Sequence, residues 1–326
     1  MTALITGLPV PVAAIPAKGP VLSLLSSSIA PATETDDFQL DEQALEALPA
    51  ELVDEINARS DEMWTRGFGW TPDFTFASEV QAANDITSDD YSVPGDLPAI
   101  QYFQPYLVKT IISASAFGWS EVDYQGRAQR ALDLLTPSLM ESEFWDGTLA
   151  QAKSYPNNFL TNKSDPKFID VTPTVGTPVD IAKGLALLQQ ALGDTAVPPG
   201  DENANIKPSG QGMIHMPLEV SLSLLNVRRV GKLMLDIYDN IIVPGTGYSG
   251  DAPLTDSRPA GSVYMYATDM VMTRIGKPRT FPETLAEALD RGQTGQPNLI
   301  TFRAERFVAA YWDNLRHFGV NVSLPS

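Results

Sequence analysis

The stretch from Val122 to Gly147 reads VDYQGRAQRALDLLTPSLMESEFWDG and is the longest helical pattern in the chain. Charged residues fall mostly on one side of the pattern, and apolar residues recur on the other with a slightly drifting period of about 3.6 residues. The apolar stripe consists of Ala128, Ala131, Leu132, Leu135, Leu139 and Phe144. The pattern predicts a long amphipathic helix that packs this stripe against a core formed by the rest of the chain.

Both ends of this helix carry recognisable signals, and a proline interrupts it. Asp123 is typical of an N-cap residue, whose side chain accepts a hydrogen bond from the first turn. Gly147 is typical of the left-handed residue that ends a helix. Pro137 removes one helix hydrogen bond and crowds the carbonyl of Asp133. The helix therefore either kinks at Pro137, or stops and restarts with Thr136 as N-cap and Pro137 as first residue.

The composition favours a folded protein with many short elements. The chain has 326 residues, of which 43% are hydrophobic and 19% charged, so it can bury a core for one large or two ordinary domains. Its 26 prolines and 23 glycines indicate many turns and irregular connections. It has no cysteine, which excludes thiol catalysis, disulfides and thiolate metal sites.

The charge and the N-terminal composition argue against a nucleic-acid-binding protein, a membrane protein and a protein with a signal peptide. A protein that binds nucleic acid normally carries a basic patch. This chain has a net charge of −18, and its densest basic cluster is Arg228–Arg229. No stretch approaches the roughly 18 apolar residues that span a bilayer, so we expect no membrane partner. The apolar N-terminal stretch lacks a basic start and is interrupted by prolines, so we expect no signal peptide.

The first 62 residues divide into an apolar and an acidic part. Residues 1–33 are rich in proline and show little helical or strand period, which is typical of an extended arm. Such an arm needs a surface to order it, and a neighbouring subunit is the natural candidate. Residues 34–62 are strongly acidic, and an apolar stripe predicts one or two short helices with a solvated acidic face. That stripe consists of Leu45, Leu48, Leu52 and Ile56.

Residues 64–120 carry strand patterns on either side of a polar segment. Phe74 and Phe76 alternate with polar residues, and apolar alternation resumes from Ile100 and continues across Pro105. Between the two lies the acidic, turn-rich segment NDITSDDYSVPGDLP. Two extended segments around a polar tip predict a long hairpin or a protruding loop.

The middle of the chain alternates helix and strand patterns irregularly. Thr177 to Asp180 form a capping-box pattern with Pro178 at the first helical position, and they predict a helix that Gly193 closes. Its apolar stripe is Ile181, Leu185, Leu188 and Leu192. GMIHM predicts a buried strand, after which Pro217 opens a short helix through Asn226.

The last hundred residues are mainly strand patterns. LMLDIYDNIIVPGTGY predicts strand, turn and strand, and Val263 to Ile275 predicts one further strand. TFPETLAEALDRG predicts a short helix or ordered loop. NLITFRAERFVAAYW predicts a long closing strand, with HFGVNV as its continuation. Because helices and strands do not alternate regularly, the fold class is α+β rather than a doubly wound parallel sheet.

The sequence nominates no catalytic, cofactor-binding or metal-binding residue. Gly245 to Gly250 match GxGxxG, but the prolines that follow exclude the helix that a dinucleotide site requires, so we interpret a glycine-rich loop. The two histidines, His215 and His317, are too few for a zinc site without ligands placed by the fold, and we interpret them as structural. Forty carboxylates leave an acid–base pair open without identifying one. The five scattered tryptophans are typical of core or interface packing.

The order of these patterns resembles a known family. The long helix ends in ESEFWDG, YATDMVMTRIG precedes the last strands, and Asn298 to Arg306 read NLITFRAER, which places Arg303, Glu305 and Arg306 on the closing strand. Together with the N-terminal arm and the protruding segment, this succession resembles tailed-bacteriophage major capsid proteins of the Hong Kong 97-type fold, which encapsulins share. The stretches FGW, DYQGRA and EFWDG resemble actinobacteriophage capsid sequences.

The resemblance implies a division of the chain. It assigns an N-terminal arm that lies across neighbouring subunits, an extended loop known as the E-loop, a peripheral domain around a long spine helix, and an axial domain that meets its copies around five-fold and six-fold axes. The corresponding ranges are 1–63 for the arm, 64–110 for the E-loop, 111–176 and 263–326 for the peripheral domain, and 177–262 for the axial domain. Some family members cross-link an E-loop lysine to an asparagine. Lys109 is the only lysine in the expected E-loop and lies at its base, so we expect no such cross-link.

The implied function is structural. We expect a major capsid protein without enzymatic activity or cofactor, which forms pentamers and hexamers of itself in an icosahedral virion shell around double-stranded DNA. Assembly would take place in the host cytoplasm, with a portal and possible scaffold or decoration proteins as partners. An encapsulin-type compartment is the nearest alternative. A soluble hydrolase or glycan-binding protein that uses carboxylates and tryptophans is the alternative from another class.

Overall fold

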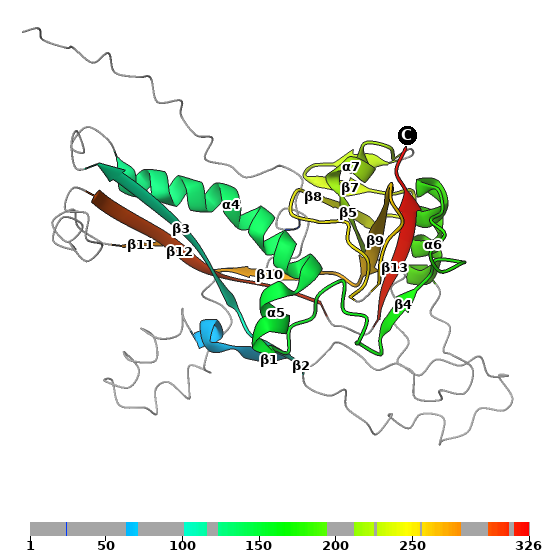
Figure 1. Ribbon diagram of the computed structural model, residues 1–326, viewed down its shortest axis with the longest axis horizontal. Helices are drawn as coiled ribbons and strands as arrows, with labels where there is room; N and C mark the ends of the chain where they lie inside the picture. Colours follow the sequence, from blue (N-terminus) through cyan, green and yellow to red (C-terminus); the bar gives the residue numbers. More distant parts are fainter. Residues whose placement is uncertain are drawn as a thin grey trace, which may run out of the picture.

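The computed structural model describes residues 24, 63–70, 101–115, 123–193, 212–224, 227–254, 256–281, 299–312 and 316–325. These residues form a mixed helix-and-sheet protein, which confirms the coarse fold class. Figure 1 shows two parts: an elongated one, in which a long helix lies along a narrow sheet, and a second sheet with smaller helices beside it. The expected helices at 34–62 and most of TFPETLAEALDRG lie outside the described residues.

The long helix α4 runs from Tyr124 to Asp146 and keeps the predicted ends. The Asp123 carboxylate accepts a hydrogen bond from the amide of Gly126 at 2.8 Å. Gly147 has φ of 58°, and its amide bonds to the carbonyl of Glu143. The helix continues through Pro137, and the hydroxyl of Thr136 donates back to the Leu132 carbonyl at 2.6 Å. The alternative in which the helix stops and restarts at Thr136 is therefore wrong.

The face that α4 buries differs from the predicted stripe. Leu135 and Leu139 are 47% and 45% exposed, so their prediction as core residues is wrong. Burial follows rows of residues four apart, which is the ridge that a helix commonly packs into a neighbour. Because α4 is covered from two directions, the buried set also includes polar residues. It consists of Ala128, Leu132, Thr136, Pro137, Met140, Glu141, Phe144 and Trp145.

The sheet under α4 is antiparallel and centred on the closing strand. Strand β12 (Leu299–Tyr311), predicted as one long strand, pairs with β3 along ten residues and with the short β10 and β11. Side chains alternate between a face covered by α4, with Val108 and Phe302 buried, and an outer face on which Ile111 is 56% exposed. The partner strands are β3 (Tyr106–Ser115), β10 (Met272–Ile275) and β11 (Arg279–Phe281).

A small ribbon closes the base of the predicted protruding segment. Strand β1 (Phe68–Trp70) follows the 3-10 helix η1 (Met63–Arg66) and pairs antiparallel with β2 (Gln101–Phe103). The first predicted extended segment, at Phe74 and Phe76, lies outside the described residues together with the rest of 71–100, so the predicted hairpin itself stays a prediction. The chain then passes Pro105 and enters β3 directly.

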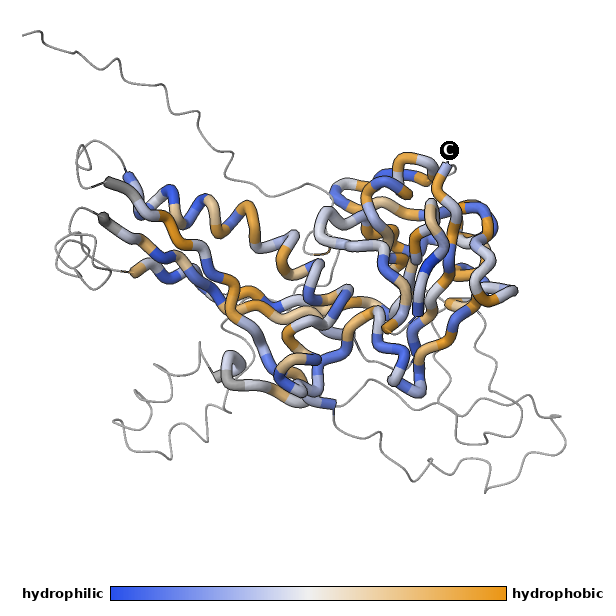
Figure 2. Tube along the Cα trace, in the orientation of Figure 1, coloured by the Kyte–Doolittle hydropathy of each residue, from blue (hydrophilic) through white to orange (hydrophobic). Residues whose placement is uncertain are grey.

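The second sheet has seven strands in the order β4-β13-β9-β5-β8-β7-β6. Strands β5, β8 and β9 are buried along their whole length, because helix α6 (Ile181–Gly193) covers one face and residues from the end of α4 contribute to the core on the other. Figure 2 shows apolar stretches among the strands of this part. The strands are β4 (Phe168–Asp170), β5 (Met213–Pro217), β6 (Arg228–Val230), β7 (Leu233–Leu235), β8 (Ile241–Gly245), β9 (Ser262–Thr268) and β13 (His317–Ser323).

Two strand predictions near the C-terminus were wrong in their connections. The single strand expected over Val263 to Ile275 is divided into β9 and β10, which belong to different sheets. Strand β13 does not continue β12 but pairs with β9 and β4 in the seven-stranded sheet. From β9 to β13 the chain thus passes between the sheets twice, and the seven-stranded sheet combines strands from both sides of the expected boundary at residues 262 and 263. The assignment of these ranges to peripheral and axial domains stays a prediction.

Two helix starts also differ from prediction. Asp180, rather than Thr177, accepts a hydrogen bond from the first turn of α6, at 2.9 Å from the amide of Lys183. The segment before it is held as a bridge to β13, which excludes an earlier helix start. Pro217 ends β5, and helix α7 spans only Leu218–Ser221. A further short helix, α5 (Thr148–Lys153), follows Gly147 directly.

Candidate functional site

A buried carboxylate joins three distant segments at the centre of the molecule. Glu141 lies on α4 and has no exposed surface. One of its oxygens, Oε1, accepts a hydrogen bond from the amide of Leu24 at 3.0 Å, and Oε2 accepts one from the amide of Gly247 at 2.9 Å. Residue 247 is 106 positions away from Glu141 in the sequence, and residue 24 is 117 positions away. We call this arrangement the Glu141 junction.

The glycine-rich loop packs so closely on α4 that position 247 has no room for a side chain, and only glycine fits there. A Cβ atom at this position would lie 2.0 Å from the carbonyl oxygen of Ser138, which no side chain can tolerate. The loop therefore binds a carboxylate of its own chain. No helix follows it among the described residues up to 261, which agrees with our interpretation of GxGxxG as a loop.

The environment of Glu141 favours its neutral form. Burial raises its pKa, and the hydrogen bonds from Gly247 and Leu24 act in the opposite direction. Among the described residues, no ion pair involves this carboxylate. A buried carboxyl group with a raised pKa occurs both in catalytic sites and in structural cores. Here its oxygens are used by backbone amides of the same chain, so the contacts indicate a structural junction.

The junction also bears on the predicted N-terminal arm. Leu24 has no exposed surface and belongs to the same hydrophobic core as Phe144 and Trp145 on α4. At residue 24, therefore, the chain packs on its own body. The other residues of the expected arm, up to 62, lie outside the described residues, and the contact with neighbouring subunits stays a prediction.

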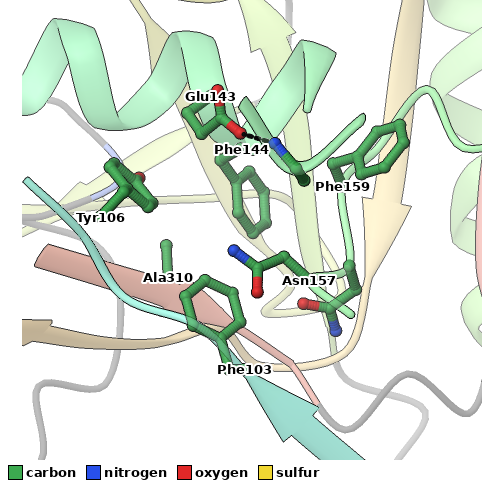
Figure 3. A pocket seen from close by; sticks show the side chains of 9 residues that line it. Phe103, Tyr106, Glu143, Phe144, Asn157, Phe159 and Ala310 are labelled. Carbon is green, nitrogen blue, oxygen red and sulfur yellow. Dashed lines mark hydrogen bonds between the residues drawn. The ribbon is translucent and has the colours of Figure 1, made fainter. Parts of the chain in front are cut away.

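A second carboxylate beside the junction borders a small recess. Glu143 accepts hydrogen bonds from the amides of Leu149 and Ala150 at the start of α5, at 2.9–3.0 Å. Figure 3 shows Glu143 at the recess with Tyr106 and Asn157 around it. The volume open to the centre of a water-sized sphere is about 10 Å³, which is room for about one water molecule. Substrate pockets are far larger, so this recess suits a buried water.

Both histidines are fully buried, and their structural role stays an interpretation. His215 lies 3.0 Å from the hydroxyl of Tyr248 through Nδ1 and 2.9 Å from that of Thr268 through Nε2. Thr268 donates its own hydrogen to the carbonyl of Asp269, so His215 must donate from Nε2 and accept at Nδ1. Burial lowers the pKa of His215 to about 3, so the ring stays neutral.

His317 has a different environment. Its ring lies between Phe168 and Trp312. Burial lowers its pKa to about 4, against a smaller opposing effect of the Asp165 carboxylate. The described residues contain no group of three or more potential metal ligands, and none of their helices is long and apolar enough to cross a membrane.

The structure also places two of the tryptophans and the lysine of the expected E-loop. Trp145 and Trp312 are fully buried and packed against other aromatic rings, which confirms the packing interpretation for these two. Lys109 lies on the exposed face of β3, opposite Glu305 of β12. Trp119 lies outside the described residues.

The described surface exposes many large apolar side chains. They occur on β2, on the outer face of β3, on the flank of α4, on and after β4, and in and around α7, β6 and the turn after β7. Exposed apolar groups that gather in patches are typical of contacts with other molecules. The residues that are at least 37% exposed are Tyr102, Leu107, Ile111, Leu135, Leu139, Ile169, Val175, Leu218, Leu222, Val230, Ile237 and Tyr238. No sequence signal identified them, because their periodicity is that of core residues.

Comparison with solved structures finds similar folds in shell-forming proteins. The capsid of Ralstonia phage GP4 is 11% identical over 80% of this chain and 84% of the other, with a TM-score of 0.46. A structure from Mycobacterium phage Bobi is 11% identical over 81% and 87%, with a TM-score of 0.42. A holo encapsulin complex from Synechococcus elongatus is 10% identical over 70% and 78%, with a TM-score of 0.40. No protein-family model and no curated protein matches the sequence.

Proposed function

We propose that this chain is a phage major capsid protein of the Hong Kong 97-type fold, which assembles into an icosahedral shell. The observation that carries the proposal is the open outer face of the four-stranded sheet. On β3 this face exposes Leu107 and Ile111 while the opposite face is buried under α4. Exposed apolar side chains at alternate positions of a strand, such as these two on either side of Lys109, are typical of a contact with another molecule.

The order of elements supports the division that the resemblance implies. A long helix with a packed sheet would form the peripheral domain around the spine, and the pairing of β1 with β2 closes the base of the proposed E-loop. Residues 1–63 would be the arm and 177–262 the axial domain. The contact of Leu24 with Glu141 gives the arm a fixed point on its own subunit, from which the remaining residues could reach a neighbour.

The charge supports a container for nucleic acid without strong adhesion to it. At −18, the chain repels the DNA backbone, so double-stranded DNA would be held by enclosure rather than by release of counterions. The proposed partners are further copies of the chain in pentamers and hexamers, a portal, and scaffold or decoration proteins. The proposed location is the virion, with assembly in the host cytoplasm and no enzymatic role.

The test is negative-stain microscopy of the purified protein, expressed alone and together with the products of adjacent genes. Closed shells support the proposal, and shells that contain nuclease-protected DNA support a phage capsid. Shells filled only with a protein cargo would instead favour the encapsulin-type compartment. Monomers in both preparations, or open tubes, would overturn the proposal.

The proposed shell should lack covalent cross-links between subunits. The described part of the proposed E-loop offers only Lys109, which lies at its base beside Glu305. Boiled, denatured particles should therefore run as single chains on a gel. A ladder of covalent multimers would contradict this expectation.

A further inference from the structure

The ribbon of β1 and β2 is attached to the body through the residue that follows it. Gln104 lies between β2 and Pro105, at the point where the chain enters β3. Its amide donates to Oδ1 of Asn157 at 2.7 Å, and its carbonyl accepts a hydrogen bond from Nδ2 of the same side chain at 2.9 Å. One side-chain amide thus satisfies both backbone groups of Gln104, as a neighbouring strand would. We call this pair of bonds the Asn157 clamp.

The clamp has a fixed support on the side of the body. Asn157 is 8% exposed and borders the small recess (Figure 3). The next residue, Asn158, donates to the carbonyl of Trp312 directly after β12, at 2.9 Å. The amide of Leu160 donates to the carbonyl of Phe144 on α4 at 3.0 Å. The segment that carries the clamp is therefore bonded to both α4 and the end of β12.

Aromatic packing holds the ribbon on a second side. Phe68 of β1 and Phe103 of β2 stack with their ring centres 5.8 Å apart. Both rings contact the ring of Tyr311 on β12, at 4.9 Å and 5.8 Å between centres. The guanidinium of Arg274 on β10 lies 4.6 Å from the centre of the Phe68 ring. The ribbon is thus attached to the four-stranded sheet through both of its strands.

The base of the ribbon lacks the backbone freedom that a hinge requires. A hinge is made of residues that can change φ and ψ when the attached segment moves. At Gln104 both backbone groups are bonded, and the ring of Pro105 restricts φ of the next residue. Gly67, just before β1, has φ of 111°, and a Cβ atom there would lie 2.8 Å from Oε1 of Gln104. The residue before the ribbon and the residue after it are therefore in close contact.

We propose that the Asn157 clamp locks the base of the predicted protruding segment, so that Asn157 sets the direction in which this segment leaves the body. The segment, residues 71–100, departs from Trp70 and returns at Gln101, which are paired in the ribbon. Because the base is ordered in advance, a contact made by the segment does not have to order it, which lowers the entropy cost of binding. Asn157 is then a positioning residue that acts through Gln104.

Hydrogen exchange on the full-length chain tests the clamp. In Asn157→Ala the amide of Gln104 loses its acceptor, so its exchange should become about tenfold faster, which corresponds to about 1.4 kcal/mol. Exchange in β1 and β2 should rise as well, while β3 and β5 keep the rates of the wild type. Pro105 has no amide, so the signal of residues 101–104 is separate from that of β3. Unchanged exchange at Gln104 would overturn the proposal, and so would an equal rise in β3 and β5, which would indicate a general loss of stability.

Two further variants separate the clamp from a loss of volume. Asn157→Asp has nearly the same size but places a second acceptor against the carbonyl of Gln104, so at neutral pH it should loosen the ribbon as alanine does. Gln104→Ala is the matched control, because it keeps the two backbone groups that the clamp holds, and its ribbon should exchange as in the wild type. A firm ribbon in Asn157→Asp, or a loosened one in Gln104→Ala, would contradict the clamp.

The consequence for assembly rests on the proposed function. Among particles viewed by negative-stain microscopy, Asn157→Ala should give fewer closed shells and more irregular ones than Gln104→Ala, because the protruding segment no longer leaves the body in one direction. Regular shells of Asn157→Ala with faster exchange at Gln104 would reject the positioning role. If the wild type forms no shells, the proposed function fails, and the exchange rates still decide whether the clamp holds the base.

Discussion

The two sheets of this protein complete their burial in different ways. In the seven-stranded sheet, β5 alternates between two hydrophobic cores, so that Ile214 and Met216 pack toward α6 and Met213 packs toward α4. In the four-stranded sheet, β3 buries Tyr106 and Val108 under α4 and exposes Leu107 on the other face. The central strands of the first sheet are covered on both faces by their own chain, whereas the second sheet is covered on one face only, and its other face exposes apolar and charged side chains.

The comparison predicts which residues stabilise the isolated chain and which form contacts between chains. Residues that stabilise the folded chain should cluster in the doubly covered sheet, in the α4 face of the open sheet and at the Glu141 junction between them. Residues on the outer face of the open sheet should matter little to the isolated chain and much to the assembled particle. The following variants test this division.

The largest effect is expected on the covered face of the open sheet. Phe302 is 5% exposed and stacks on Tyr124 of α4 at a ring distance of 6.3 Å. Phe302→Ala should lower the free energy of unfolding by about 3–5 kcal/mol, measured by urea denaturation. Ile111→Ala, on the outer face of the same sheet, is the matched control and should change it by less than about 0.5 kcal/mol. Equal losses would show that both faces are buried in the isolated chain.

The Glu141 junction should give the next effect. Glu141→Ala leaves the amides of Leu24 and Gly247 buried without an acceptor, which costs about 1–3 kcal/mol for an unsatisfied donor. Part of this cost is offset because the alanine removes a carboxylate that is expensive to bury. The released N-terminal segment should also become a new site of cleavage in limited proteolysis. Unchanged cleavage with unchanged stability would contradict the role of this junction.

The buried histidines should make the free energy of unfolding depend on pH. A substitution of His317 alone should isolate the contribution of that residue. His317 stays neutral in the folded chain down to a pKa of about 4, against 6.5 when unfolded. As the pH falls below 6.5, only the unfolded chain binds the proton, so stability is lost by roughly 1.4 kcal/mol per pH unit. His317→Phe removes this loss, so relative to wild type the variant should gain about 2 kcal/mol between about pH 7 and about pH 5.

Wild type and variant must be compared because the buried carboxyl groups change the free energy of unfolding with pH in the opposite direction to the histidines. Burial raises the pKa of Glu141, Glu143 and Asp146 above their usual values. Their stabilising effect is full below the unfolded pKa and is lost as the pH rises through the folded pKa. Urea denaturation at the two pH values, on both proteins, separates the histidine from these acids. A constant difference between the proteins would refute the assignment of His317.

The smallest expected effect concerns the packing of α6 on the doubly covered sheet. A Cβ atom at Gly184 would lie 2.3 Å from Cγ1 of Val322, a short side chain with little room to move. Gly184→Ala should therefore cost about 1–2 kcal/mol, measured by thermal unfolding. Gly193→Ala, on the same helix with open space around it, should be neutral or slightly stabilising. The reverse order would mean that α6 is not packed on this sheet as described.

The sequence predicted features that depend on neighbouring residues. The caps of α4 at Asp123 and Gly147 were confirmed because a cap is a contact between residues a few positions apart. The stripe of α6 and the buried strand β5 were also confirmed, since a strong apolar period leaves few alternatives. The candidate site was different, because Glu141 was one carboxylate among forty and its burial depends on segments more than a hundred residues away.

By itself, the sequence thus determined the element types, the ends of the long helix, and the absence of thiol chemistry. Only the tertiary structure decided that Leu135 and Leu139 face outward, that β9 and β10 part into different sheets, and that Leu24 meets Glu141. The physical reason is the sequence separation over which each interaction acts. Caps and periodicity act within one or two turns, whereas burial and strand pairing depend on which distant segments share the same space.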